Sequence, residues 1–319
     1  KYFDSKPSLA TRQCSMAAIE SISALFPQLI GGSADLSGSN NTKTSNSKII
    51  NSKNFDGNYI HYGVREHGMA AVMNGMALYG GLIPYGGTFL IFSDYCKPSI
   101  RLSALMGLRV IYIFSHDSIG LGEDGPTHQP IEQLTGLRAI PNLNIFRPAD
   151  INETIECWQV ALKSHGTPSV IALSRQKVPY INPKNSVENK CEKGAYVVNI
   201  TSHESNVTIV ASGTEVELAL KVQEKLKENN IDSKVVSMPC MELFDKQPKN
   251  FQNDIIDQDS LVVTLEAGSI MSWQKYIKNK GMNVGIDQFG ESAPYKEVYN
   301  HFGLSEEKIT NFIQKKLRE

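Results

Sequence analysis

Residues 115–132 (SHDSIGLGEDGPTHQPIE) hold the densest group of side chains that could do chemistry. This stretch has two histidines, four acidic residues and three glycines, and it directly follows an apolar run. Histidines move protons near neutral pH, carboxylates bind hydroxyl groups or metal ions, and glycines let the backbone approach a ligand. No G-K-[ST] or G-x-G-x-x-G pattern is present, so the stretch is not a nucleotide-binding fingerprint. A metal site made of His116, Asp117, Asp124 and His128 lacks compact, helix-phased spacing; it stays open as an alternative, as does a plain polar surface loop.

Four further apolar runs are also followed by glycine or serine beside a charged or aromatic residue. These segments are GGSAD (31–35), GVREH (63–67), GGTF (86–89) and SR (174–175). In an open parallel sheet the carboxyl ends of the strands meet at one edge, where ligands bind. The sequence therefore predicts one pocket lined by five strand ends.

Short apolar runs that alternate with longer helical patterns predict the sheet that would position these residues. Strands are expected at residues 29–30, 59–62, 82–85, 109–115, 143–146 and 169–173, and helices at 9–25, 67–78, 93–106, 130–139 and 151–164. Asp150, followed three residues later by Glu153, has the form of a capping box for the last helix. Residues 40–58 are rich in Asn, Ser and Lys, which predicts a surface loop.

The alternation ends near Pro179, and a second α/β series follows a polar, aperiodic stretch. Its strands are expected at residues 195–200, 207–212, 234–238, 260–265 and 283–287, and its helices at 215–229, 271–278 and 305–317. We therefore predict an α/β fold of two consecutive domains with mainly parallel sheets, at residues 1–182 and 193–319, with a linker at 183–192. Five of the seven histidines fall in the first domain, where we expect the chemistry.

Composition narrows the class of protein. The chain has 319 residues, 41% of them hydrophobic, which fits about two globular domains. Its net charge is 32 − 33 = −1, which argues against a nucleic-acid partner, and no apolar run is long enough to predict a membrane span. Five scattered cysteines without a C-x-x-C pair predict reduced thiols and a cytoplasmic protein. Because the sequence begins at Lys1 rather than Met, we expect that the chain was cut from a longer one.

Residues 8–319 resemble the C-terminal two-thirds of transketolases. The matching runs occur in order along the chain: GGSADLSGSN (31–40), GVREHGM (63–69), GGTFLIFSDY (86–95), HDSIGLGEDGPTHQPIE (116–132), LSRQ (173–176), ASGTEVELA (211–219) and DQFGESAP (287–294). The resemblance implies a pyrimidine-binding domain followed by the family's C-terminal domain. It also implies the family's activity, the thiamine-diphosphate-dependent transfer of a two-carbon ketol unit from a ketose phosphate to an aldose phosphate in the pentose phosphate pathway.

The resemblance assigns residues to the cofactor site. Glu66 matches the carboxyl group that hydrogen-bonds the pyrimidine ring and so promotes deprotonation of the thiazolium carbon, which needs a carboxyl that keeps or shares a proton. Phe89, Phe92 and Tyr95 match the residues that pack on the ring, and their spacing at a helix start favours one common face. Asp35 lies beside this site in the family.

The substrate site is implied in the same way. The phosphate of the sugar would be held by residues that match the family's clamp: Arg12, Ser39, His116 and Arg175. Asp124 matches the carboxylate that recognises a hydroxyl group next to the acceptor carbonyl. His128 matches the histidine at the reacting end of the donor, where it would bind an oxyanion or transfer a proton.

The diphosphate and Mg²⁺ half of such a site is absent from the sequence, because no Gly-Asp-Gly occurs. In transketolases that half lies in an N-terminal domain, and each site is shared across a homodimer. We therefore expect a fragment or one subunit of a split enzyme that is inactive alone and holds no metal ligands of its own.

Several alternatives remain at this stage. They are a dihydroxyacetone synthase, a deoxyxylulose phosphate synthase-like enzyme, the beta subunit of a 2-oxo acid dehydrogenase, and a non-catalytic module of this fold. The resemblance makes the second domain a packing and dimer-supporting unit without site residues. There, the Ser212-Gly213-Thr214 segment is read as a helix N-cap or as an anion cradle.

Overall fold

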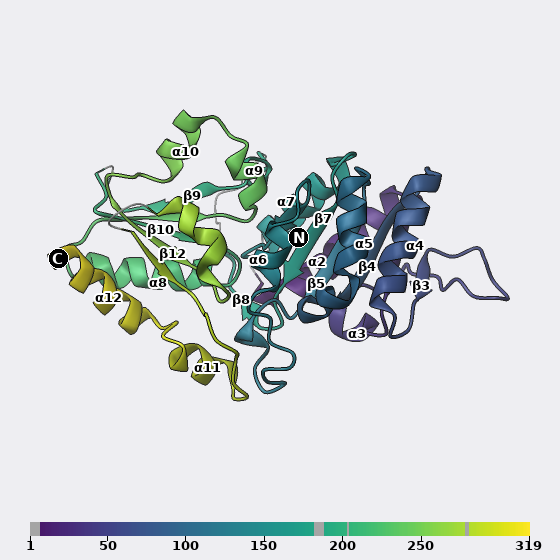
Figure 1. The fold of residues 1–319 in the computed structure, drawn as a ribbon, viewed down its shortest axis with the longest axis horizontal. Helices are drawn as coiled ribbons and strands as arrows, with labels where there is room; N and C mark the ends of the chain where they lie inside the picture. Colours follow the sequence, from purple (N-terminus) through teal and green to yellow (C-terminus); the bar gives the residue numbers. More distant parts are fainter. Residues whose placement is uncertain (1–6, 182–187, 203, 278–280) are drawn as a thin grey trace.

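The computed structural model describes residues 7–181, 188–202, 204–277 and 281–319. Two α/β units lie side by side along the long axis of the molecule, and the C-terminus is at the outer end of the second (Figure 1). The predicted two-sheet α/β fold is confirmed. The domain boundaries themselves stay a prediction, and residues 183–187 of the proposed linker lie outside the described part.

The first unit is built on a six-stranded sheet of parallel strands. Its strand order is β3 (Tyr59–His61), β2 (Leu29–Ser33), β4 (Ile83–Phe89), β5 (Ile111–Ser115), β7 (Ser169–Leu173) and β6 (Asn144–Phe146). Every residue of β4, β5 and β7 is buried. Both faces are therefore covered, as is usual for parallel sheets.

Alternation along β5 shows how the two faces are covered. Tyr112 and Phe114 belong to the core under α4 (Glu66–Tyr79), α5 (Ser93–Leu105) and α6 (Gln133–Arg138). Ile111 and Ile113 belong to the opposite core, which contains residues of α2 (Thr11–Leu25) and α7 (Ile151–Lys163). A capping box has two hydrogen bonds, and the first of the two predicted for α7 is present: the Asp150 carboxylate accepts the N–H of Glu153 at 2.9 Å.

The second unit has a five-stranded, mainly parallel sheet. Its order is β13 (Met282–Val284), β12 (Leu261–Leu265), β10 (Val207–Ala211), β11 (Ser233–Ser237) and β9 (Tyr196–Ile200), and β9 is antiparallel to β11. One face packs on α8 (Glu215–Glu228) and α12 (Glu306–Arg318). The other face packs on α9 (Met241–Asp245), α10 (Lys249–Ile255) and a 3₁₀ helix, η4 (Ile270–Tyr276).

Buried charges join the two units. The fully buried Arg147 donates to Asp117 of the first unit at 2.9 Å, and to the Ser212 carbonyl (3.0 Å) and the Glu215 carboxylate of the second. Arg138 forms a two-pronged pair with Glu266 at 2.6 and 2.7 Å. Such pairs are strong only while every partner is present, so the two units depend on each other for charge neutralisation.

Some local predictions were wrong. Residues 270–276 form a 3₁₀ helix rather than the predicted helix over 271–278, of which residue 278 is outside the described part. The predicted surface loop at 40–58 begins with buried residues, Asn40, Thr42 and Thr44. The sequence reading also missed a two-residue strand pair, β1 (Leu9–Ala10) with β8 (Lys177–Val178), and the short helices α3 (Ser37–Asn40), α9, α10 and α11 (Tyr295–His301).

Candidate active site

The five predicted strand ends do meet at one edge of the first sheet, because β2, β3, β4, β5 and β7 are parallel neighbours in it. Asp35 follows β2 with a left-handed backbone (φ 63°) and an exposed side chain. Glu66 follows β3, Phe89 ends β4, His116 follows β5 and Arg175 follows β7. Side chains far apart in the sequence are thereby brought to a common surface.

An aromatic ladder runs from the end of β4 into α5. The ring centroids of Phe89 and Phe92 are 5.7 Å apart with an interplanar angle of 11°, and those of Phe92 and Tyr95 are 5.9 Å apart at 27°. The predicted common face is therefore confirmed, although Phe89 lies on the strand rather than on the helix. Exposure rises along the ladder from 8% at Phe89 to 64% at Tyr95. An aromatic surface is thus open for a flat ligand to pack on.

Glu66 is the first residue of α4, and only 8% of it is exposed. Within the described residues its carboxylate accepts no hydrogen bond, so this buried group is available to a ligand. Its negative charge acts on Cys96 of the adjacent helix α5: burial, followed by the Glu66 charge, raises the pKa of that thiol to about 12. Cys96 therefore stays protonated at neutral pH.

Arg12 and Arg175 form a cationic cluster whose charge acts on His116. Arg12, near the start of α2, donates to the Ser39 carbonyl at 2.8 Å, and Arg175 donates to the Leu121 carbonyl at 2.9 Å. Burial, followed by the positive charge of Arg175, lowers the pKa of Arg12. The Nε of Arg12 is buried without a hydrogen-bond partner in the described part of the chain. Two close cations and an unused donor suit a bound anion.

His116 lies between this cluster and the ladder. Its ring centroid is 3.7 Å from that of Phe89. Burial, followed by the charges of Arg12, Arg175 and His128, lowers the pKa of His116 to about 3. The imidazole is therefore neutral at physiological pH and can donate or accept only one hydrogen bond at each nitrogen.

The loop after β5 carries the two remaining predicted residues. Asp124 is exposed and makes no hydrogen bond within the described residues. His128 is half-buried; its ring centroid is 5.6 Å from that of Phe92, and its Nδ1 is 3.0 Å from the Thr127 hydroxyl. Both side chains thus lie on the one loop that also carries His116, and His128 is in contact with the aromatic ladder.

The second unit holds this loop in place. The Ser292 hydroxyl donates to the Glu123 carbonyl at 2.5 Å, and the Gln129 amide donates to the Glu291 carbonyl at 3.0 Å. A Cβ on Gly290 would meet the Gln129 side-chain oxygen at 1.7 Å, so a larger residue there would displace the Gln129 amide. The DQFGESAP motif (287–294) contains no residue predicted to bind a ligand, yet it holds the loop that carries Asp124 and His128.

Two other expectations are corrected by side-chain contacts. Ser212 donates to Glu266 at 2.5 Å and Thr214 donates to Glu215 at 2.7 Å, so these hydroxyls bind carboxylates rather than capping α8 or cradling an anion. Asp117, one of the four residues of the alternative metal site, instead accepts a hydrogen bond from Arg147. Among the described residues, no group of three or more His, Cys, Asp or Glu side chains is arranged to hold a metal ion.

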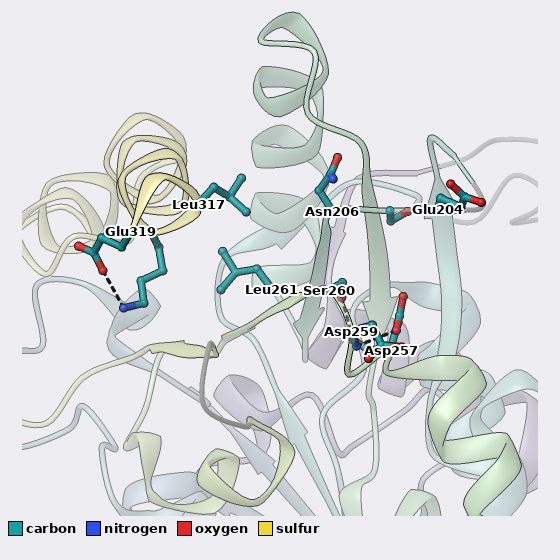
Figure 2. Close-up of a pocket in the computed structure, with 10 residues that line it drawn as sticks. Glu204, Asn206, Asp257, Asp259, Ser260, Leu261, Leu317 and Glu319 are labelled. Atoms are coloured by element: carbon teal, nitrogen blue, oxygen red, sulfur yellow. Dashed lines mark hydrogen bonds and ion pairs between the residues drawn. The ribbon is translucent and has the colours of Figure 1, made fainter.

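A cavity of about 720 Å³ lies in the second unit, at the end of the sheet where β10 and β12 begin (Figure 2). None of the predicted site residues lines it. Its lining is rich in acidic side chains, Glu204, Asp257, Asp259 and Glu319, which disfavour an anionic ligand. The strand-end surface of the first unit is therefore the better candidate site. No helix in the described residues has the length and apolar character needed to cross a membrane.

Comparisons with known proteins agree with the architecture. The family model described as the transketolase pyrimidine-binding domain matches residues 7–180, and the model of the transketolase-like C-terminal domain matches residues 194–305. The chain is 52% identical over 302 residues to a transketolase of Sinorhizobium medicae, covering 94% of this chain and 43% of that protein. It is 45% identical over 316 residues to a transketolase of Bacillus subtilis, covering 98% of this chain and 47% of that protein. The chain thus spans less than half the length of these curated relatives.

Solved structures give the same result. The transketolase of Leishmania mexicana superposes with a TM-score of 0.91 at 40% identity, over 98% of this chain and 47% of that one. A structure titled as a split gene transketolase, an inactive β4 tetramer, superposes with a TM-score of 0.79 at 24% identity, over 97% of this chain and 99% of that one. At that identity the second likeness establishes the fold alone.

Proposed function

Because the chain belongs to the transketolase family, we propose that it forms the pyrimidine-side half of a site that uses thiamine diphosphate to transfer a two-carbon ketol unit between sugar phosphates. The observation that carries this proposal is the convergence of three features at one sheet edge. They are the buried Glu66 carboxyl, the aromatic ladder from Phe89 to Tyr95, and the anion site of Arg12 and Arg175. A cofactor with a flat nitrogen-containing ring and a phosphorylated substrate would use all three.

The cofactor residues fit the pyrimidine end of thiamine diphosphate. Bound there, the cofactor supplies the nucleophilic thiazolium carbon that accepts the ketol unit. Glu66, which accepts no hydrogen bond in the described residues, would hold a proton against the ring nitrogen. Phe92 and Tyr95 would pack on the ring and exclude water, and Phe89 would support them from the strand. Asp35 lies at the end of the neighbouring strand β2 and would border the same pocket.

The substrate residues divide by charge. Arg12 and Arg175 would neutralise the sugar phosphate, with hydrogen bonds from Ser39 and from the neutral His116. Asp124 would accept a hydrogen bond from the hydroxyl group next to the acceptor carbonyl and so select its configuration. His128, beside the ladder, would donate a proton or a hydrogen bond to the reacting oxygen.

The sequence has no Gly-Asp-Gly, the pattern that holds the diphosphate and Mg²⁺ in the family it resembles. We propose that a separate diphosphate-binding domain supplies the ligands of both and that this chain alone is inactive and binds the cofactor weakly. The split gene transketolase described above is titled inactive and has nearly the extent of this chain. Mg²⁺ would then be held mainly by phosphate oxygens and the missing domain.

We propose that the complete enzyme is a homodimer that uses the outer face of α4 and α5. This face exposes an unusual number of large apolar side chains: Val72, Leu78, Tyr79, Tyr95, Leu102, Leu105 and Met106. Exposed apolar patches of this kind mark interfaces. Tyr95 belongs both to this face and to the ladder, so a partner docked here would cover the cofactor pocket.

The domain division at 1–182 and 193–319 is part of the same proposal, as each unit has its own sheet and cores. All five cysteines are free and buried, which supports a cytoplasmic location.

Mixing this chain with a diphosphate-binding domain of a transketolase tests the proposal. We expect ketol transfer from a ketose phosphate in the mixture and none from either half alone. Glu66→Gln should abolish most of the turnover while leaving the circular dichroism spectrum unchanged. Glu307→Gln is the matched control, since Glu307 is also in the first turn of a helix but exposed and remote.

The outcomes separate the alternatives. Full activity of Glu66→Gln would refute the role of Glu66. No turnover in a mixture that forms a complex would favour a non-catalytic module. Transfer of the ketol unit only to an unphosphorylated acceptor would favour a dihydroxyacetone synthase, and the use of pyruvate as the donor would favour a deoxyxylulose phosphate synthase-like enzyme. Micromolar binding of thiamine diphosphate and Mg²⁺ to the isolated chain by calorimetry would contradict the half-site.

A further inference from the structure

A buried chain of hydrogen bonds ends on His116 and is not explained by the residues assigned so far. The Ser33 hydroxyl donates to Oδ1 of Asn40 at 2.9 Å, and Nδ2 of Asn40 donates to the Ser115 hydroxyl at 2.8 Å. The Ser115 oxygen is 2.9 Å from Nδ1 of His116. The first three residues are fully buried and His116 is 3% exposed, so water does not compete with these bonds.

The donors and acceptors of this chain determine where the His116 proton lies. The Ser33 oxygen accepts the Leu36 N–H at 3.1 Å, and its proton is shared between Oδ1 of Asn40 at 2.9 Å and the Gly87 carbonyl at 3.1 Å, of which Asn40 is the nearer. The Asn40 amide nitrogen can only donate, so it uses a lone pair of the Ser115 oxygen. Nδ1 of His116 is the remaining acceptor for the single proton of Ser115, and a buried hydroxyl without an acceptor would be costly. Nδ1 of His116 therefore accepts, and its proton is on Nε2.

We propose that Asn40 and Ser115 are positioning residues that hold His116 as the neutral Nε2–H tautomer, so that Nε2 donates a hydrogen bond to the phosphate of the sugar substrate. This rests on the proposed function for the identity of the ligand, but not for the tautomer itself. Arg12 and Arg175 supply the charge for the anion, while His116 supplies a directed donor. The opposite tautomer would present a lone pair to the phosphate oxygens and weaken binding.

Two observations support a directed donor. The depressed pKa of His116 keeps the ring neutral, so only one of its nitrogens carries a proton and the tautomer matters. The backbone of His116 is left-handed (φ 61°), a conformation that costs free energy for a residue with a Cβ and is found at functional sites. Together with the Phe89 ring, 3.7 Å away, these contacts fix the orientation of the imidazole.

The tautomer can be measured on the chain itself by ¹⁵N-histidine NMR. Long-range ¹⁵N–¹H correlations at pH 7 should show His116 as a single Nε2–H form, with the resonance identified by its loss in His116→Gln. Ser115→Ala should remove that preference and populate both tautomers. The matched control is Ser169→Ala, because Ser169 is a buried serine of the adjacent strand β7 whose hydroxyl has no partner in the described residues. An Nδ1–H form in the unmodified chain, or no change in Ser115→Ala, would overturn the proposal.

The consequence for substrate binding is tested in the assembled enzyme. Ser115→Ala should raise KM for a phosphorylated acceptor by about twofold, because the binding-competent Nε2–H tautomer would then be only about half populated. It should leave kcat and the KM for glycolaldehyde, which has no phosphate, unchanged, and Ser115→Thr should restore the phosphate-dependent KM. Equal increases in both KM values would indicate a merely structural role and overturn the proposal. If the assembled enzyme transfers no ketol unit, the proposed function fails while the NMR result still decides the tautomer.

Discussion

Replacement of Arg147 by methionine should strongly destabilise the chain. Arg147 is fully buried, and its guanidinium group neutralises Asp117 of the first unit and Glu215 of the second, both of which are buried as well. Methionine fills much of the same volume but leaves these two carboxylates without their shared cation. Breaking a buried ion pair by removing one partner costs about 3–5 kcal/mol. We expect a loss of this size in the free energy of unfolding at pH 8.

The loss should also depend on pH in a defined direction. Without Arg147, the buried carboxyl groups would have pKa values above those in the unfolded chain, so the folded variant binds protons more readily. The free energy of unfolding of the variant should therefore recover, relative to the unmodified chain, as the pH falls from 8 to 5. Burial raises the pKa of Asp117 even in the unmodified chain, although the positive charge of Arg147 lowers it. Removal of Arg147 should therefore raise this pKa further.

Urea unfolding followed by circular dichroism at pH 8 and pH 5 measures both effects. The control is Lys221→Met, which removes an exposed pair with Glu217 whose side chains are 50% and 32% accessible. Such a pair is worth about 0.5 kcal/mol or less. The reasoning would be refuted if Arg147→Met lost less than about 1 kcal/mol at pH 8, or if its deficit were the same at both pH values.

Three further outcomes are expected. Burial raises the pKa of Glu153 to about 7, so the folded chain binds a proton there more tightly than the unfolded chain does. As the pH rises from about 4.5 to 7, the free energy of unfolding should therefore fall by up to about 1.4 kcal/mol per pH unit. Urea unfolding of Glu153→Gln should lack that slope, and an unchanged slope would contradict the assignment. Gly194→Ala should lower the melting temperature more than Gly303→Ala: both glycines have φ near 80°, but only at Gly194 would a Cβ meet backbone, 2.2 Å from a nitrogen of α9. Leu105→Glu, on the exposed face of α5, should shift sedimentation toward monomer while Phe312→Glu on α12 should not, and equal effects would refute the interface.

The position of the candidate site at one edge of the first sheet could be predicted from the sequence, because it depends only on local patterns of apolar residues. Alternating apolar residues place Tyr112 and Ile113 on opposite faces of β5, and the parallel arrangement then brings every following loop to the same edge. The relative places of Glu66, Phe89 and His116 follow from that rule without any knowledge of side-chain contacts. The spacing of Phe89, Phe92 and Tyr95 predicts one face, and the rings do stack in line, although Phe89 joins the other two from the end of β4 rather than from a helix.

The contacts that orient the side chains could not be predicted in this way. Asn40 and Ser115 are 75 residues apart, and Ser292 is 169 residues from Glu123. No periodicity links such pairs, since their meeting depends on how loops of different elements pack. Thr214 is a similar case: a helix-start pattern predicts a cap, yet a carboxylate next to it forms the stronger bond. The DQFGESAP segment (287–294) is a recognisable motif, but nothing in its composition indicates a contact with the substrate loop.

Because of these long-range contacts, the second unit helps to position the loop that carries the predicted substrate residues. Its carboxylates neutralise Arg147, whose Nε holds Asp117 next to His116, and its residues 290–295 hold the far part of the same loop. The loop that carries all three predicted substrate residues after β5 is therefore linked to the second unit through Arg147 near its start, and directly through Glu123 and Gln129. A chain that ended after the first sheet would leave Arg147 paired with Asp117 alone. It would also remove the hydrogen bonds that Glu123 and Gln129 of the loop make with Ser292 and Glu291. The geometry of the site thus depends on both units, even though its predicted ligand-binding side chains all come from the first.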